Sequence, residues 1–307
     1  MATAFITHAD CARHEMGRHH PESPARLAAI EGHLISSGVA GLVERHEAPA
    51  ANTSELARVH PREYIEAIRD ASPRSGIAHL DPDTAMCPYT WDAALHAAGA
   101  AVLATDLVIG RRADSAFCAV RPPGHHATRT RAMGFCLFNN VAVGAMHALE
   151  RHGLSRVAII DFDVHHGNGT EDIFSDDERV VMASIFQHPF YPYSGTEDPA
   201  PNMANVPLPA GSDGKALRTA VEKIWMPALD ELEPQMIFVS AGFDAHVEDD
   251  MAGLRFTEAD YAWVTQRIKE VADKYSEGRI VSVLEGGYAL SALGRSVVTH
   301  LKVLGAF

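Results

Sequence analysis

The sequence has few of the features that mark several classes of protein. Only four of its 307 residues are cysteines, and they are scattered without a CxxC pair, which is typical of free thiols in a reducing compartment. Positive charge is also scarce. The formal net charge is -14, whereas a protein that binds a nucleic-acid backbone needs clustered Lys and Arg. We therefore expect no direct nucleic-acid partner.

Signals of export or membrane insertion are also missing. The first ten residues, MATAFITHAD, contain no basic region followed by an apolar one, so we expect no signal peptide. We find no apolar run that approaches the roughly 18 residues of a membrane helix. These absences predict a cytoplasmic protein with no membrane partner.

The chain carries enough apolar residues, 47%, to bury a substantial core. Its length is near the upper size of one α/β domain, and it has no repeat or long linker, so we expect a single domain over residues 1–307. Several nearly continuous apolar runs precede polar loops and helical stretches, which predicts a parallel sheet covered on both faces. These runs are residues 115–120, 156–161, 236–241 and 279–284.

Two stretches carry the end signals of helices. Ser23 is a candidate N-cap with Pro24 in the first turn, and Gly38 follows the expected end of that helix. Thr257 is a candidate N-cap of a second helix that continues to Tyr275.

Polar residues follow each of the four predicted strands. Ligands of open α/β sheets bind outside the carboxyl ends of the strands, so these loops should meet at one edge of the sheet. The loops contain the sequences RPPGHH, FDVHHGNG, GFDAH and EGGY.

Three of these residues predict a metal site. Asp163 and His165 stand two positions apart, so in an extended segment their side chains point to the same side. Asp244 from another strand end completes a set of three ligands with room for water, as in an open catalytic zinc site. The alternative, a solvated acidic loop, explains neither the aliphatic strand before it nor the matching strand ends.

Further residues suit chemistry beside such a metal. His125 and His126 are candidates for acid and base catalysis on a metal-bound water. Tyr288 follows two glycines, including Gly287, that let the backbone approach a ligand closely. Its hydroxyl is a candidate for stabilising an oxyanion.

Together and in this order, five motifs resemble the zinc-dependent histone deacetylase superfamily, closest to its class II members and their bacterial relatives. They are RPPGHH, GFCLFNN, DFDVHHGNGT, SAGFD and LEGGY, with HPESPARL and VHPREYI as similar N-terminal motifs. The resemblance implies an arginase/deacetylase-like α/β fold with a largely parallel central sheet. It implies an amidohydrolase that removes acetyl or other short acyl groups from acyl-lysine or related acyl amines.

The resemblance also implies roles for individual residues. Asp163, His165 and Asp244 would bind one Zn²⁺ per chain, His125 and His126 would be the tandem catalytic histidines, and Tyr288 would polarise the acyl carbonyl. The residues implied for the substrate channel and its rim are Phe135, Gly134, Tyr191, Asp83, Met251 and Gly287.

The same resemblance implies a structural K⁺ ion and places Asp161 beside His125. The implied K⁺ ligands are Asp161, Asp163, His165, Ser184 and Ile185. His166 has no metal role in the family and is expected to be a packing residue. Asn168 stands where some relatives have Asp, and an amide stabilises an imidazolium less than a carboxylate does. We therefore expect His126 to be the general base and His125 to remain an electrostatic partner.

The substrate and several other properties stay open. An acetylpolyamine amidohydrolase is the main alternative, because polyamine-selective relatives carry an acidic gatekeeper. That position falls here on Met251, although the acids at 248–250 precede it. A ureohydrolase-like enzyme with two metal ions and a non-catalytic ligand-binding module are further alternatives. A homo-oligomer is not excluded, and the segment 186–205 is the candidate rim loop.

Overall fold

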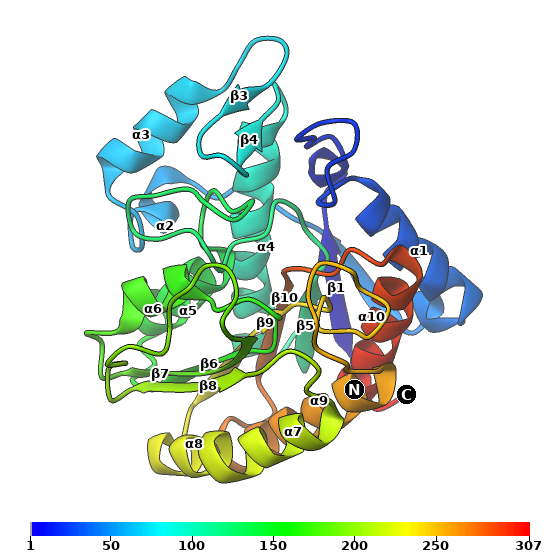
Figure 1. Cartoon of the computed structure of the whole chain (residues 1–307). Coiled ribbons are helices and arrows are strands. Elements are labelled where there is room, and N and C mark those ends of the chain that lie inside the picture. Colours follow the sequence, from blue (N-terminus) through cyan, green and yellow to red (C-terminus); the bar gives the residue numbers. More distant parts are fainter. Residues whose placement is uncertain (1) are drawn as a thin grey trace.

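An eight-stranded sheet forms the centre of the fold (Figure 1). The computed structural model describes residues 2–307. Each pair of neighbouring strands in this sheet is parallel, as the sequence predicts. The strands in spatial order are β2 (Val43–Glu47), β1 (Thr3–Thr7), β5 (Ser115–Cys118), β10 (Ile280–Leu284), β9 (Met236–Ala241), β6 (Val157–Asp161), β7 (Val180–Gln187) and β8 (Met203–Leu208).

The four predicted strands are confirmed as β5, β6, β9 and β10, each within two residues at either end. Every residue in these four strands is buried. They are also the four central strands of the sheet, which explains why their sequences are nearly continuous apolar runs. A separate antiparallel pair, β3 (Ala78–His79) and β4 (Ala85–Met86), lies away from the main sheet (Figure 1).

Helices cover both faces of the sheet and form two core clusters. The first cluster includes α2 (Thr53–Leu56), α3 (Arg62–Ala71), α4 (Thr90–Ile109), α5 (Asn140–Arg151) and α6 (Asn168–Phe174). The second includes α1 (Ala25–Ser36), α7 (Gly214–Ala220), α8 (Met226–Leu232), α9 (Glu258–Tyr275) and α10 (Leu290–Gly305). Single turns η1 (Ala9–Ala12) and η2 (Val39–Gly41) and a π-helical segment η3 (Val221–Trp225) complete the described elements.

One predicted helix start is confirmed and the other is wrong. Thr257 caps α9 in a reciprocal capping box with Asp260. Ser23 does not cap α1, because the chain turns one residue later, at Pro24, and no side chain bonds to the first turn. Gly38 lies just beyond the end of this helix in the left-handed region, with φ of +79°.

The expectation that no segment is long and apolar enough to span a membrane is also wrong. By length and composition, α4 passes that test over its 20 residues. However, 67% of its apolar window is buried inside the protein, against the sheet and α5. Its apolar character is therefore that of a core helix.

The loop after β7 differs in extent from the predicted rim segment. Phe186 and Gln187 still belong to β7, and β8 begins at Met203, so the loop covers residues 188–202. The predicted boundaries failed because this segment is flanked by buried apolar residues that continue the strands on both sides.

Candidate active site

Three buried side chains meet beyond the ends of β6 and β9, which are neighbouring strands. Asp163 and His165 follow β6, and Asp244 follows β9. The Nδ1 atom of His165 lies 2.9 Å from Oδ1 of Asp163 and 3.2 Å from Oδ2 of Asp244. Their candidate ligand atoms all lie within 4.8 Å of one another, so the predicted set is brought together.

The charges in this cluster are poorly balanced by the protein alone. Burial, followed by the charge of Asp163, raises the pKa of Asp244 to about 6. Burial opposes the charged form of His165, but the two carboxylates outweigh it and raise the pKa of His165 to about 10. Oδ2 of Asp244 is buried and accepts no hydrogen bond. Two buried carboxylates and an imidazole, with a carboxylate oxygen that accepts no hydrogen bond, are a suitable donor set for a divalent cation.

Two glycines explain how the backbone closes around these carboxylates. A Cβ atom at Gly286 would lie 2.0 Å from Oδ2 of Asp244, and one at Gly242 would lie 2.1 Å from Oδ2 of Asp163. Gly286 N donates to Asp163 Oδ2 at 2.9 Å. The GFD and EGGY motifs therefore need glycine because no side chain fits against the cluster.

The tandem histidines have different partners. Nδ1 of His125 lies 2.9 Å from Oδ2 of Asp161, and Nδ1 of His126 lies 2.7 Å from Oδ1 of Asn168. Burial lowers the pKa of His125, but the carboxylates of Asp163 and Asp161 outweigh burial and raise it. Burial and the neighbouring imidazoles of His125 and His165 hold the pKa of His126 well below its usual range. The two rings thus favour opposite protonation states.

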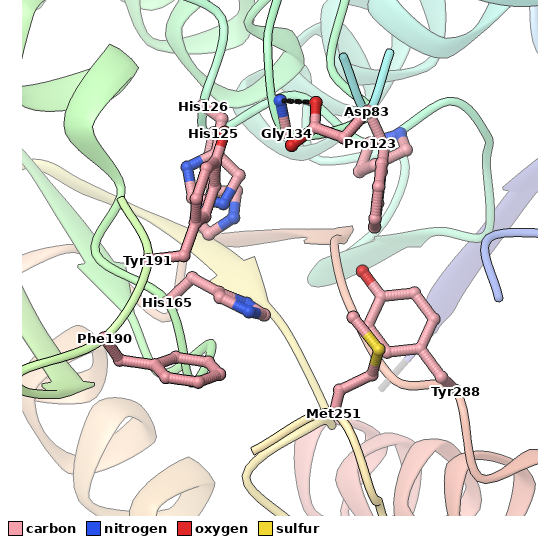
Figure 2. Close-up of a pocket in the computed structure, with 11 residues that line it drawn as sticks. Asp83, Pro123, His125, His126, Gly134, His165, Phe190, Tyr191, Met251 and Tyr288 are labelled. Atoms are coloured by element: carbon pink, nitrogen blue, oxygen red, sulfur yellow. Dashed lines mark hydrogen bonds between the residues drawn. The ribbon is translucent and has the colours of Figure 1, made fainter. Parts of the chain in front are cut away.

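The rings of His125, His126 and His165 line a cavity of about 150 Å³ (Figure 2). Figure 2 shows Tyr288 and Met251 across the cavity from His126 and Tyr191. Most of the predicted channel residues line the cavity, but Gly287 does not: its carbonyl oxygen accepts from Nε of Arg26 at 2.7 Å. The lining residues are Asp83, Pro123, His125, His126, Gly134, Phe135, His165, Phe190, Tyr191, Met251 and Tyr288.

One wall of the cavity has a constrained backbone. Gly134 has φ of +57°, and a Cβ atom there would lie 2.4 Å from the ring of His126. Its N–H donates to Asp83 Oδ1 at 3.1 Å, and the next N–H, of Phe135, donates to Thr84 Oγ1 at 3.0 Å. Phe135 itself has φ of +70°, which is strained for a residue with a side chain. The 83–84 segment therefore holds this wall in place.

The comparisons with known proteins agree with this geometry. The model of the Histone deacetylase domain matches residues 20–304. The chain belongs to the histone deacetylase family. A histone deacetylase-like amidohydrolase of Pseudomonas aeruginosa is 38% identical over 88% of this chain and 73% of its own length. A probable deacetylase of Archaeoglobus fulgidus is 35% identical over 100% of this chain and 86% of its own length.

A solved structure carries the same fold. The crystal structure of the HDA15 HD domain matches with a TM-score of 0.93 and 33% identity, over 99% of this chain and 88% of that one. The resemblance to the family and the predicted α/β fold are therefore confirmed. As a member of the histone deacetylase family, the chain is a hydrolase.

Sequence reasoning gave no role to Glu285, although it lies in the LEGGY motif of this deacetylase-family chain. Its fully buried carboxylate accepts from the N–H groups of Gly124 at 2.7 Å and His125 at 3.1 Å. Burial raises the pKa of Glu285 to about 7. Glu285 therefore links the end of β10 to the loop that carries the tandem histidines.

The HPESPARL motif also has a role that its sequence did not reveal. Arg26 is fully buried, and its guanidinium carbon lies 5.0 Å from the ring centroid of Tyr288. Glu22, also buried, pairs with both Arg26 and Arg121. The buried charge of Arg26 is thus compensated beneath the Tyr288 loop.

His166 contacts the 188–202 loop rather than the cluster of Asp163, His165 and Asp244. Its Nδ1 lies 2.8 Å from Oγ of Ser194, and its Nε2 lies 3.0 Å from Oε2 of Glu171. That loop supplies Tyr191 and also Phe190, which the sequence analysis missed; the Phe190 ring stacks on His165 with centroids 5.5 Å apart. The only sequence signal for Phe190 was its position next to Tyr191, a predicted wall residue.

Other groups of His and acidic residues lie close together in the described chain, but side chains of Arg occupy two of them. Nη1 of Arg58 lies 2.8 Å from Nδ1 of His147 in the group with Asp106 and His152. Arg295 bridges Glu248 and Glu258 in the group with His246. The group of His8, Asp10 and His96 is only partly buried. The Asp163, His165 and Asp244 cluster differs in being wholly buried beside a cavity.

Proposed function

We propose that this chain is a zinc-dependent deacylase that hydrolyses acetyl-lysine or a related acyl amine. The observation that carries the proposal is the buried cluster of Asp163, His165 and Asp244 beside a narrow cavity lined by two histidines and Tyr288. One Zn²⁺ per chain would be held by these three residues. When bound there, it would act as a Lewis acid on the acyl carbonyl. We propose that residues 1–307 form one catalytic domain.

His126 is suited to take the proton of the attacking water. Its Nδ1 donates to the Asn168 oxygen, which leaves the lone pair of Nε2 free, and its lowered pKa keeps the ring neutral. His125, with a raised pKa and Asp161 at its Nδ1, stays positively charged and stabilises negative charge nearby. His126 then carries the proton to the leaving amine.

Tyr288 is suited to stabilise the oxyanion that forms from the acyl carbonyl. Burial, together with the charge of Asp244, raises the pKa of its hydroxyl, so the hydroxyl keeps its proton and can donate a hydrogen bond. The ring lies edge-on to Phe135, with centroids 6.1 Å apart. This contact limits the tilt of the Tyr288 ring at the cavity wall.

The cavity favours an acyl-lysine chain over an acetylpolyamine. Its walls include the rings of Phe135 and Tyr191 and the thioether of Met251, which suit an aliphatic chain. Of the nearby acids, Glu248 pairs with Arg295 at 2.6 Å and Asp249 is buried. Only Asp250 of this run is exposed without a partner in the described structure. We propose that Asp83, at the rim, contacts the substrate backbone.

We also propose a structural K⁺ ion beside the metal cluster. Asp161 and Ser184 pair across β6 and β7, and Oγ of Ser184 is buried without a hydrogen-bond partner. Such an orphaned oxygen next to a buried carboxylate suits a monovalent cation. The carbonyls of Asp163, His165 and Ile185 would complete the site.

All four cysteines are free and buried, which supports a cytoplasmic location.

The test is hydrolysis of a matched acetyl-lysine peptide and acetylpolyamine by the zinc-loaded protein, with Tyr288→Phe as the control. We expect the peptide to be preferred and the activity to be lost in the control. Preference for the polyamine would assign the site to the alternative substrate. No hydrolysis of either would contradict the proposal, and two metal ions per chain would favour a ureohydrolase.

A further inference from the structure

Asp249 occupies an unusual place between the rim of the cavity and Tyr288. It follows Asp244 by five residues in the loop after β9, and its side chain is 5% exposed. One carboxylate oxygen, Oδ2, accepts from Tyr288 N at 2.6 Å and from Ala289 N at 3.0 Å. The other, Oδ1, accepts from Met251 N at 3.1 Å. One side chain thus joins two loops that both line the cavity.

The Tyr288 backbone needs such a partner. Gly287 has φ of +121°, and α10 begins two residues after Tyr288 with Ala289 as its N-cap. Ala289 has no side-chain oxygen to satisfy the free N–H groups at the start of this helix. Asp249, from another loop, accepts instead from the N–H groups of Tyr288 and Ala289, the two residues just before the helix, and its negative charge is favourable near the N-terminus of α10.

The Tyr288 side chain has no comparable anchor of its own. The ring contacts Phe135 edge-on, and Arg26 lies 5.0 Å from its centroid while donating to the carbonyl of Gly287. These contacts limit the tilt of the ring. Asp249 holds the backbone N–H of Tyr288, which is bonded to the Cα atom from which the side chain projects.

We propose that Asp249 is a positioning residue that couples the orientation of Tyr288 to the rim loop carrying Met251. The inference rests on the role proposed above for Tyr288. Asp249 does not reach the reacting atoms; it acts through the Tyr288 backbone. A carboxylate is required because it offers acceptors on both sides, whereas an amide turns an NH₂ group toward one of the two loops.

The test compares Asp249→Asn with Asp250→Asn, its exposed neighbour, in the zinc-loaded protein. We expect Asp249→Asn to lower kcat on the acetyl-lysine peptide by about tenfold or more, since small misplacements of catalytic groups cost rates of this order. We expect Asp250→Asn to leave kcat within about twofold. Loss confined to KM in Asp249→Asn would overturn the proposal.

A double-substitution experiment separates positioning from a general structural role. In the Tyr288→Phe background, the further substitution Asp249→Asn should lower any residual rate by less than about threefold, because its target group is already gone. Independent, multiplicative losses would show that Asp249 acts elsewhere and would overturn the proposal.

Hydrogen exchange gives a readout that does not depend on activity. In Asp249→Asn the amides of Tyr288 and Ala289 should exchange faster, while Asp250→Asn should leave them unchanged. Unchanged exchange in Asp249→Asn would overturn the coupling even in an active enzyme. If the wild-type protein hydrolysed neither substrate, the deacylase assignment would fail, and the exchange experiment would still report on the contact.

Discussion

The imidazoles of His125 and His126 have ring centroids 4.1 Å apart, yet the pKa of the first is raised and that of the second is lowered. Asp161 faces one ring and Asn168 faces the other. Burial disfavours the charged form of both rings, but the carboxylates of Asp163 and Asp161 outweigh burial at His125, whereas at His126 the amide of Asn168 adds little against burial and the neighbouring imidazoles.

The first prediction concerns the pH dependence of hydrolysis. Since the pKa of His126 is lowered, its base form is present at neutral pH and is lost only as the pH falls below this pKa. In His125→Ala, a neighbouring positive charge is removed, so the acidic limb should persist and move to higher pH. Profiles of kcat/KM against pH measure this shift. Disappearance of the limb in His125→Ala would show that His125 is the base.

The second prediction concerns the proposed K⁺ site. Ser184→Ala should lower Tm in KCl and reduce the difference in Tm between KCl and LiCl. Ser296→Ala is the matched control, since its hydroxyl is also buried without a partner but lies in α10. If Ser184 held no ion, removing its unpaired hydroxyl should be neutral or should stabilise the protein by about 1 kcal/mol in either salt.

The third prediction concerns the 188–202 loop. Gly195 and Gly211 both have φ of +87°, but a Cβ atom at Gly195 would lie 2.6 Å from the His166 ring, whereas one at Gly211 meets nothing within 4 Å. Each Ala substitution should cost about 1 kcal/mol of backbone strain. Gly195→Ala should in addition displace Phe190 and Tyr191 and raise KM. Equal KM values in the two variants would show that His166 does not position the cavity wall.

The fourth prediction concerns stability in acid. Burial lowers the pKa of His60 to about 4 from an ordinary value of 6.5, and its Nε2 accepts from Asn139 N at 3.0 Å. Below pH 6.5 the unfolded chain therefore binds a proton that the folded protein does not, and stability falls until the pH reaches about 4. Between pH 7 and pH 5 this loss is about 2 kcal/mol.

Denaturant unfolding of His60→Gln at both pH values measures this contribution. The variant should lose about 2 kcal/mol less than the wild type on acidification. His19→Gln, at an exposed position, should behave as the wild type does. An unchanged pH dependence in His60→Gln would contradict a neutral buried imidazole.

Sequence reasoning located the parts of the site that depend on local pattern. Asp163, His165 and Asp244 could be predicted because each follows an apolar strand, and parallel strands end at one edge of a sheet. Asp249 and Arg26 could not, since their partners are backbone groups of Gly287, Tyr288 and Ala289, far along the chain. A contact to a distant backbone N–H or C=O leaves no mark in the spacing of side chains.

Three errors had equally physical causes. Ser23 is a good capping residue, but the turn forms at Pro24, so the choice between neighbouring cap positions depended on tertiary context. The composition of α4 is compatible with a membrane helix and with a core helix, and only its burial against the sheet distinguishes the two. Gly287 was expected in the cavity because a glycine lets the backbone approach a ligand closely, but its carbonyl faces Arg26.

The strand order has a consequence for how the protein is made. The four site-bearing strands lie side by side in the order β5, β10, β9, β6, although β10 is the last strand of the chain. On the ribosome, β5 and β6 emerge long before β10, which lies between β5 and β9 in the finished sheet. Nascent β5 therefore lacks a neighbour on one side until residues 280–284 have been synthesised. The cluster of Asp163, His165 and Asp244 can be assembled before β10 emerges, whereas Tyr288 follows β10 and joins the cluster only afterwards.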